Sequence, residues 1–159
     1  MPSHLEMHRD RHPALPAERL RAWDRFGQPD GPTANFFPGL VGLRLEEVRS
    51  DYARMRLPHR REVDQPQGVI HGGALATLAD TVVAPAVGSG YDERRALFTV
   101  TMSIQYLDAI AGEDAIAEGW VEKRGRSMCF CQVEIRSASG VLAATATVVY
   151  KVSSRTIAS

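Results

Sequence analysis

The sequence predicts an α+β fold in which an antiparallel sheet wraps around one long central helix, with a short N-terminal helix before it. Six short apolar runs have the composition and alternation of strands, and brief turn-like segments join most of them. One segment, 71–87, is apolar or small on every side of a helical wheel. Such a helix is normally buried all round, and a curved sheet together with a second copy of the chain can achieve this.

Composition limits the class of protein. The chain has 159 residues, which suits one domain, and its 19 basic and 19 acidic residues argue against a general nucleic-acid binder. No apolar run reaches the roughly 18 residues that span a membrane, and the N-terminus lacks the apolar centre of a secretory signal. Cys129 and Cys131 lie on one predicted strand with poor geometry for bonding each other. We therefore expect free thiols and a cytoplasmic location.

The first 35 residues precede the predicted sheet domain, which we place at 36–159. Residues 1–15 are polar and predict a flexible tail. Its histidines recur every four residues, as metal ligands on a helix would, but no further ligand cluster supports a metal and a solvated tail is preferred: His4, His8 and His12. Residues 16–35 predict a short helix followed by a loop.

The short helix is predicted over Pro16–Gly27. Leu20, Trp23 and Phe26 fall at one-turn spacing, and the glycine that follows them is a typical stop.

Beyond this point the apolar period changes to two. Two runs before the central helix predict a hairpin, and four runs after it, joined by short turns, predict a strongly twisted antiparallel meander. The six predicted strands are 40–48, 52–58, 97–107, 114–124, 127–137 and 141–152.

The central helix has one strongly apolar face, formed by Leu75, Leu78, Ala79, Val82, Val83 and Ala86. Pro85 is expected to kink or loosen the last turn. Between His71 and Tyr91, Asp80 is the one carboxylate. A buried carboxylate without a partner is costly, so Asp80 needs either a hydrogen-bonding neighbour on a strand or a chemical task.

The start of this helix has the properties of an anion site. Its glycines leave backbone N–H groups open, and the helix dipole adds partial positive charge. Gly72 and Asp80 are about 12 Å apart along one helix axis, by the 1.5 Å rise per residue. They can act on one carbonyl only if two antiparallel helices from two copies lie side by side. In the alternative interpretation, His71 is only a helix cap.

The segment "QGVIHGGALATLAD", preceded by "GLRLEEV" and "ARMRLP" and followed by "TVTMSIQYLDAIAGE", resembles the hotdog-fold acyl-CoA thioesterases, in particular the phenylacetate-degradation (PaaI-like) branch. The resemblance runs from about residue 36 to residue 152. It implies the hotdog fold, a homodimer that often pairs into a tetramer, and hydrolysis of an acyl-CoA thioester to free acid and coenzyme A. Aryl-acyl thioesters are one possible substrate class among several.

The resemblance also implies catalytic roles. The Gly72 N–H would bind the thioester carbonyl, and Asp80 of the partner subunit would act as base or nucleophile. His71 would position the glycine turn, and Thr99 would hold the attacking water. Gln65 stands where the family commonly has asparagine, so the same amide would be carried on a side chain longer by one methylene group.

Coenzyme A carries several phosphates, and basic side chains at a predicted turn could bind them. These are Lys123, Arg124 and Arg126, with Arg61 a weaker candidate; a solvated hairpin tip is the alternative. We expect no metal and no cofactor, because coenzyme A is part of the substrate and no His/Cys cluster has metal-ligand spacing.

Two other functions stay open at this point. One is a non-catalytic acyl-CoA-binding or regulatory hotdog protein. The other is a hydratase or dehydratase, for which the sequence lacks the expected Asp/His or His/Glu pair. A Ser–His–Asp hydrolase is disfavoured because there is no G-x-S-x-G motif.

Overall fold

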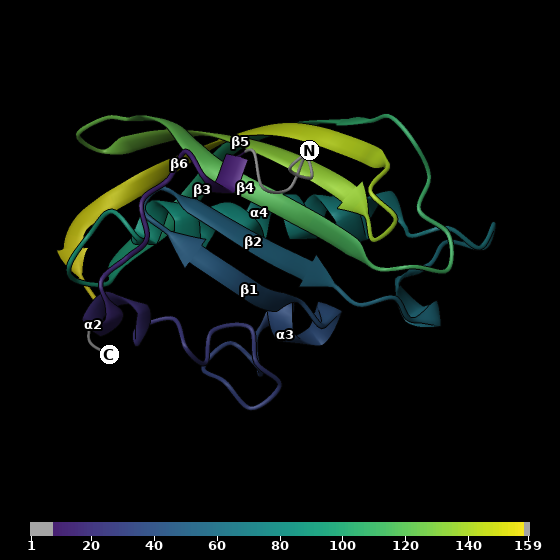
Figure 1. Cartoon of the computed structure of the whole chain (residues 1–159), viewed down its shortest axis with the longest axis horizontal. Helices are drawn as coiled ribbons and strands as arrows, with labels where there is room; N and C mark the ends of the chain where they lie inside the picture. Colours follow the sequence, from purple (N-terminus) through teal and green to yellow (C-terminus); the bar gives the residue numbers. More distant parts are fainter. Residues whose placement is uncertain (1–7, 158–159) are drawn as a thin grey trace.

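The computed structural model describes residues 8–157 and confirms the predicted α+β architecture: one antiparallel sheet curves around one long helix (Figure 1). The helical elements are α2 (Ala17–Leu20), α3 (Phe37–Val41), the 3-10 helix η1 (Arg61–Val63) and α4 (Gly72–Gly88). The strands are β1 (Arg44–Arg49), β2 (Tyr52–Leu57), β3 (Arg95–Tyr106), β4 (Ala115–Arg124), β5 (Met128–Ser137) and β6 (Leu142–Thr156).

The strand order is β1-β2-β4-β5-β6-β3, and every pairing is antiparallel. The predicted meander is correct for β4, β5 and β6 but wrong for β3, which pairs with β6 at the far edge of the sheet. In the sequence, α4 stands between β2 and β3. It crosses the concave face of the sheet and so carries the chain from β2 to the far edge. This crossing places Thr99 of β3 directly opposite Tyr150 of β6.

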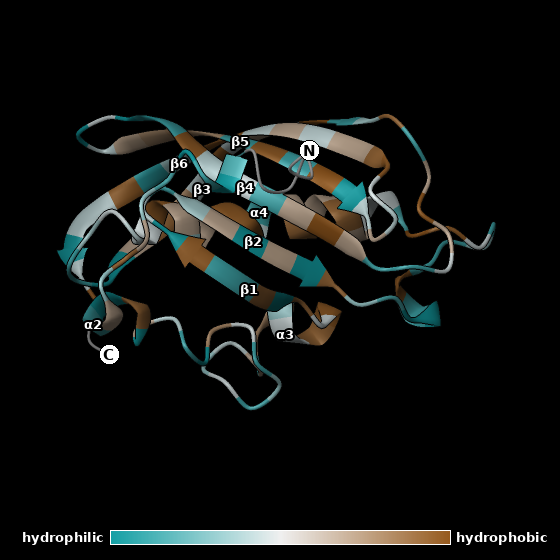
Figure 2. Cartoon of the chain, in the orientation of Figure 1, coloured by the Kyte–Doolittle hydropathy of each residue, from teal (hydrophilic) through white to brown (hydrophobic). Residues whose placement is uncertain are grey.

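The apolar face predicted for α4 is the face that packs on the sheet. Its six predicted residues are all buried, and the helix is largely hydrophobic in Figure 2. Gly119 on β4 lets the helix approach closely, because a Cβ there would lie 2.9 Å from a methyl carbon of Val82. The helix continues through Pro85 to Gly88, and the Ser89 N–H still bonds to the Pro85 carbonyl at 2.8 Å. The expected interruption therefore does not end the helix.

The N-terminal region departs from the prediction in two places. The helix α2 has only 4 residues, and turns replace the rest of the predicted helix up to Gly27. Trp23 and Phe26 still meet, edge to face, with ring centroids 5.4 Å apart. Residues 40–41, predicted to begin the first strand, instead end α3, and Gly42 stops that helix in the left-handed conformation with φ 89°.

Residues 8–15 pack along the sheet, contrary to the expectation of a loose tail. The His8 ring stacks on Trp120 at 4.1 Å, and His12 Nδ1 lies 3.0 Å from the Ser50 carbonyl. Leu15 is buried. Residues 1–7, which include His4 of the histidine series, lie outside the described residues.

Both cysteines are free, as predicted, and the structure shows that both are buried. Burial raises the pKa of the Cys129 thiol and raises that of Cys131 to about 12, so both are poor nucleophiles at neutral pH. Among residues 8–157, no helix is both long and apolar enough to cross a membrane.

Candidate active site

Asp80 lies half-buried on α4 and faces the strands β3 and β6. Its Oδ1 accepts a hydrogen bond of 2.8 Å from the Thr99 hydroxyl. The Tyr150 hydroxyl donates to the Asp80 backbone carbonyl at 2.6 Å and lies 3.3 Å from Oδ1. Within the described part of the chain, Oδ2 has no hydrogen-bond partner and no basic side chain pairs with the carboxylate. One carboxylate oxygen is thus fixed by hydroxyls, and the other is available.

Tyr150 was not singled out from the sequence. Burial, reinforced by the nearby negative charge of Asp80, raises the pKa of its hydroxyl, so the phenol stays protonated and remains a donor. The alternation of β6 predicts that Tyr150 points inward, but only the register of β6 beneath α4 places it beside Asp80. That register could not be read from the sequence.

Asp80 lines a groove of about 480 Å³. Apolar side chains dominate its walls, and they come from the N-terminal region, α4 and β3: Phe26, Phe37, Pro38, Ala76, Ala84 and Met102. A carboxylate oxygen at an apolar wall, with hydroxyls behind it, can accept a proton from water or attack an electrophilic carbon.

The start of α4 has the geometry of an anion site. His71 is the N-cap, and its Nδ1 accepts a 2.8 Å hydrogen bond from the Gly73 N–H, which places the ring proton on Nε2. The Gly72 N–H has no acceptor among the described residues. His71 is therefore a helix cap, as the alternative interpretation holds. The cap uses the Gly73 N–H, so the Gly72 N–H remains free at the positive end of the helix dipole.

Tyr106 closes the other side of this glycine turn. Its hydroxyl donates to the Gly72 carbonyl at 2.6 Å, and a Cβ at Gly72 would lie 3.2 Å from the tyrosine ring. Tyr106 therefore leaves little room for a side chain at position 72, which glycine satisfies. The sequence offered no signal for this contact, because it depends on where the end of β3 lies.

Gly72 and Asp80 occupy the same helix, eight residues apart. By the 1.5 Å rise they are about 12 Å apart along the axis, so one protomer does not bring them together. Gln65 lies in a tight turn, where its N–H bonds to the Val69 carbonyl at 2.9 Å. Among residues 8–157, its side-chain amide contacts neither Asp80 nor Gly72.

Arg124 is not a free phosphate ligand, which corrects the expectation from the sequence. Its guanidinium forms an ion pair with Asp51, donates to the Val87 carbonyl at 2.9 Å and lies over the Tyr91 ring at 4.9 Å. The ion pair outweighs the opposing effect of burial and raises the pKa of Arg124 further. Arg124 thus ties the C-terminal end of α4 to the β1–β2 turn.

The other three basic candidates are exposed. Lys123 and Arg126 lie at the β4–β5 connection, at the C-terminal end of α4, and Arg61 lies on η1 before that helix. None forms an ion pair among the described residues. Within the same part of the chain, no cluster of three or more His, Cys, Asp or Glu side chains could hold a metal ion.

Comparison with known proteins agrees with this geometry. The family model for the thioesterase superfamily matches residues 67–144, which include the glycine turn, α4 and strands β3 to β5. A Deinococcus radiodurans protein assigned as an esterase is 27% identical over 139 residues, covering 81% of this chain and 87% of its own.

Solved structures show the same fold. The Escherichia coli PaaI protein of the phenylacetic acid degradation operon has a TM-score of 0.74 at 19% identity, over 89% of this chain and 98% of its own. A hypothetical thioesterase of Streptococcus pneumoniae, solved with coenzyme A, has a TM-score of 0.65 at 24% identity, over 72% of this chain and 88% of its own. The sheet and the central helix are those of the hotdog fold, and the family match over residues 67–144 makes this hydrolase similar to the thioesterase superfamily.

Proposed function

We propose that this hydrolase cleaves an acyl-CoA thioester into the free acid and coenzyme A, at a site that two protomers share. The observation that supports this most strongly is the setting of Asp80. The Thr99 hydroxyl holds one carboxylate oxygen, and the Tyr150 hydroxyl lies 3.3 Å from the same atom. The other oxygen has no partner among the described residues, and Asp80 lines a largely apolar groove. The family match and the coenzyme A bound to the Streptococcus pneumoniae protein support the choice of thioester.

Gly72 of the partner subunit supplies the oxyanion donor in this proposal. When two α4 helices lie antiparallel about a twofold axis, each glycine turn faces the middle of the other helix. The thioester carbonyl oxygen gains negative charge as the nucleophile adds, and a preorganised N–H at a helix start stabilises that charge. Losing one such donor typically lowers the rate by about 10²–10³. His71 holds the turn in place through its bond to Gly73.

Two routes use the same groups. As a base, Asp80 takes a proton from water, the hydroxide adds to the carbonyl carbon, and the C–S bond breaks as the thiolate leaves with that proton. As a nucleophile, Asp80 forms an anhydride with the acyl group and releases the thiol, and water then cleaves the anhydride. After a single turnover in ¹⁸O-water, label in Asp80 identifies the anhydride route. Neither route calls for a metal or cofactor, and we expect treatment with EDTA to leave turnover unchanged.

The strand β3 supports association into a homodimer. Among the described strands it pairs only with β6, so its other edge is free. It also exposes large apolar side chains: Phe98 is 59%, Val100 55% and Tyr106 50% exposed. An unpaired apolar edge of this kind is a template for a second strand, here the β3 of another copy. We propose a β3–β3 dimer that pairs again into a dimer of dimers.

The basic side chains that are not engaged elsewhere are assigned to coenzyme A. We propose that Lys123, Arg126 and Arg61 contact its phosphates, and that Gln65 reaches the thioester from the partner side. The two free thiols suit a reducing compartment, and we propose the cytoplasm.

The test is a panel of acyl-CoAs with a thiol reagent that reports released coenzyme A. Wild type should turn over at least one of them, and Asp80→Asn should lower kcat by about 10²–10⁴, the usual contribution of a positioned base. Asp24→Asn, a change at an exposed acid away from the groove, is the matched control. Asp80→Asn with wild-type turnover would contradict the assigned role. Ligand-dependent stabilisation of the wild type without any turnover would instead select the non-catalytic binding protein.

A further inference from the structure

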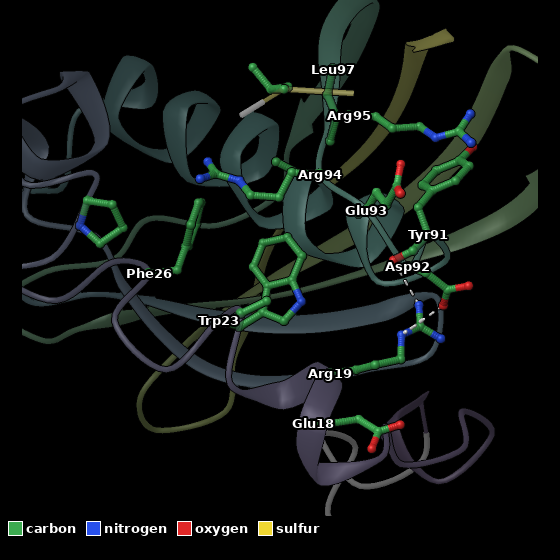
Figure 3. A pocket seen from close by; sticks show the side chains of 15 residues that line it. Glu18, Arg19, Trp23, Phe26, Tyr91, Asp92, Glu93, Arg94, Arg95 and Leu97 are labelled. Atoms are coloured by element: carbon green, nitrogen blue, oxygen red, sulfur yellow. Dashed lines mark hydrogen bonds and ion pairs between the residues drawn. The ribbon is translucent and has the colours of Figure 1, made fainter. Parts of the chain in front are cut away.

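A second cavity lies at the C-terminal end of α4 and has a volume of about 520 Å³ (Figure 3). Its walls come from several parts of the chain, including β3 and the residue Ile157. Trp23 and Phe26 come from the N-terminal segment, Ala84 and Gly88 from α4, and Tyr91 from the loop before β3. Neither the catalytic groups nor the proposed phosphate contacts lie in it.

This cavity continues the groove of Asp80. Ala84 and Phe26 line both spaces. Ala84 is four residues beyond Asp80 and Gly88 eight residues beyond, so all three lie on one face of α4. By the helical rise, the cavity extends about 12 Å from the carboxylate. A group attached to a carbonyl carbon at Asp80 therefore has a direct path into it.

Aromatic side chains of the N-terminal segment form one wall of the cavity, against α4. The Trp23 indole lies directly on Gly88, because a Cβ there would be 2.7 Å from the ring. Phe26 meets the same indole edge to face, and Leu97 of β3 lies across the cavity from them in Figure 3. The absence of a side chain at residue 88 thus lets the tryptophan form a flat apolar wall.

Charged side chains line the rest of the cavity, and in the view of Figure 3 Arg94 extends toward the Trp23 and Phe26 rings. Arg95 lies over the Tyr91 ring at 4.5 Å, and its buried Nε has no hydrogen-bond partner among the described residues. Arg19 Nε lies 3.6 Å from Asp92 Oδ1, an ion pair at the cavity wall. Three arginines and three acids line the cavity in all, so their charges balance: Arg19, Arg94 and Arg95 against Glu18, Asp92 and Glu93.

We propose that this cavity receives the acyl group of the thioester cleaved at Asp80, and that it selects apolar straight-chain or arylalkyl acyl groups of roughly eight to ten carbons. The inference rests on the proposed function. A zigzag chain with bonds of about 1.5 Å covers the 12 Å to Gly88 with about that many carbons. A shorter chain leaves the Trp23 wall uncovered, and a longer one passes Gly88 and meets Arg19, which donates to the Tyr91 carbonyl at 3.0 Å. The balanced charge of the lining disfavours the polyanionic nucleotide of coenzyme A as the occupant.

Two variants change the cavity in opposite ways. Ala84→Leu narrows the passage from the Asp80 groove, and Trp23→Ala removes the wall. Trp120→Ala is the matched control, since Trp120 stacks with His8 rather than lining the cavity. Thermal unfolding of each variant identifies any loss of fold. The substrates are butyryl-, octanoyl- and palmitoyl-CoA, together with octanoyl-N-acetylcysteamine, which lacks the nucleotide.

Wild type and Trp120→Ala should prefer octanoyl-CoA to both other chain lengths. Ala84→Leu should lower the octanoyl-to-butyryl ratio of kcat/KM at least about tenfold, the usual size of a discrimination set by methylene groups in a pocket. Trp23→Ala should move the preference toward palmitoyl-CoA. Changes in kcat/KM of the same size for every chain length would overturn the proposal. So would a Trp23→Ala variant that loses its preference for CoA over N-acetylcysteamine, since the cavity would then hold the coenzyme.

A binding measurement separates this proposal from the proposed function. If wild type hydrolyses no acyl-CoA, the proposed function has failed, but calorimetry with non-hydrolysable octyl-CoA and ethyl-CoA thioethers still tests the cavity. Ala84→Leu should then weaken octyl-CoA about tenfold more than ethyl-CoA. Equal weakening of the two thioethers would contradict the assignment.

Discussion

Replacing Thr99 with valine removes one hydroxyl from the carboxylate of Asp80 and preserves the shape of the side chain. The lost contact is the 2.8 Å hydrogen bond to Oδ1. A hydrogen bond to a charged group contributes about 1.5–3 kcal/mol, and each 1.36 kcal/mol of barrier is a tenfold change in rate. Thr99 is exposed in the protomer, which favours the lower part of that range. We therefore expect kcat to fall about ten- to a hundredfold.

The stability of the Thr99→Val variant should hardly change. Substitutions at exposed positions usually alter the free energy of unfolding by less than about 0.5 kcal/mol. The assay is steady-state hydrolysis of the best acyl-CoA in the panel, with thermal unfolding recorded in parallel. Thr99→Ser should recover most of the lost kcat, because it restores the hydroxyl. Thr101→Val, at another exposed threonine of β3, should behave as wild type. A Thr99→Val variant with unchanged kcat, or an equal loss in Thr101→Val, would refute this role of the hydroxyl.

Three further predictions concern stability and assembly. Glu118 is 1% exposed, and burial raises the pKa of its carboxyl to about 7 although the 2.5 Å bond from the Tyr52 hydroxyl opposes the shift. Its folded pKa lies above the unfolded value, so its contribution to stability is present below about pH 4.5 and is lost as the pH rises to about 7. Chemical denaturation should therefore show Glu118→Gln gaining on wild type across this window, by at most about 3 kcal/mol, and a difference that is independent of pH would contradict it. Phe98→Asp places a charge on the free edge of β3 and should shift the protein from dimer toward monomer in sedimentation; an unchanged mass would exclude that edge as the interface. Arg124→Met leaves Asp51 without its partner and should lower the free energy of unfolding by about 1–3 kcal/mol while the KM for acyl-CoA stays within about twofold, whereas a large rise in KM would restore Arg124 as a phosphate ligand.

Local sequence patterns predicted α4 and most strands, because the buried face of each element sets the spacing of its apolar residues. The buried face of α4 follows from its 3.6-residue period, and the alternation of β2 follows from its two faces. The helix predicted over Pro16–Gly27 is mostly absent for a related reason. The one-turn spacing of Trp23 and Phe26 reflects packing of both rings against the C-terminal half of α4, which a series of turns achieves as well as a helix does.

Long-range register explains the remaining differences. Thr99 and Tyr106 reach the site only because β3 joins the far edge of the sheet beside β6, and no local pattern encodes that pairing. Arg124 was assigned to an exposed turn by its basic neighbours. A bulge between Val121 and Lys123 shifts the alternation of β4, so the next side chain turns inward toward Asp51.

Mixing two variants tests most directly whether each site takes its acid from one protomer and its amide donor from the other. Asp80→Asn removes the acid. Gly72→Pro removes the N–H at the first helical position, where proline suits the helix and the extended His71 before it. Because a Cβ there would lie 3.2 Å from the Tyr106 ring, Gly72→Ala, which adds the Cβ and keeps the N–H, is the control. Asp80→Asn and Gly72→Pro should each be inactive alone. After unfolding and refolding together in equal amounts, half of the dimers are mixed and each carries one intact site, so about a quarter of wild-type activity should return. No recovery, with mixed dimers demonstrated by mass spectrometry, would place both groups of a site in one protomer and contradict the account.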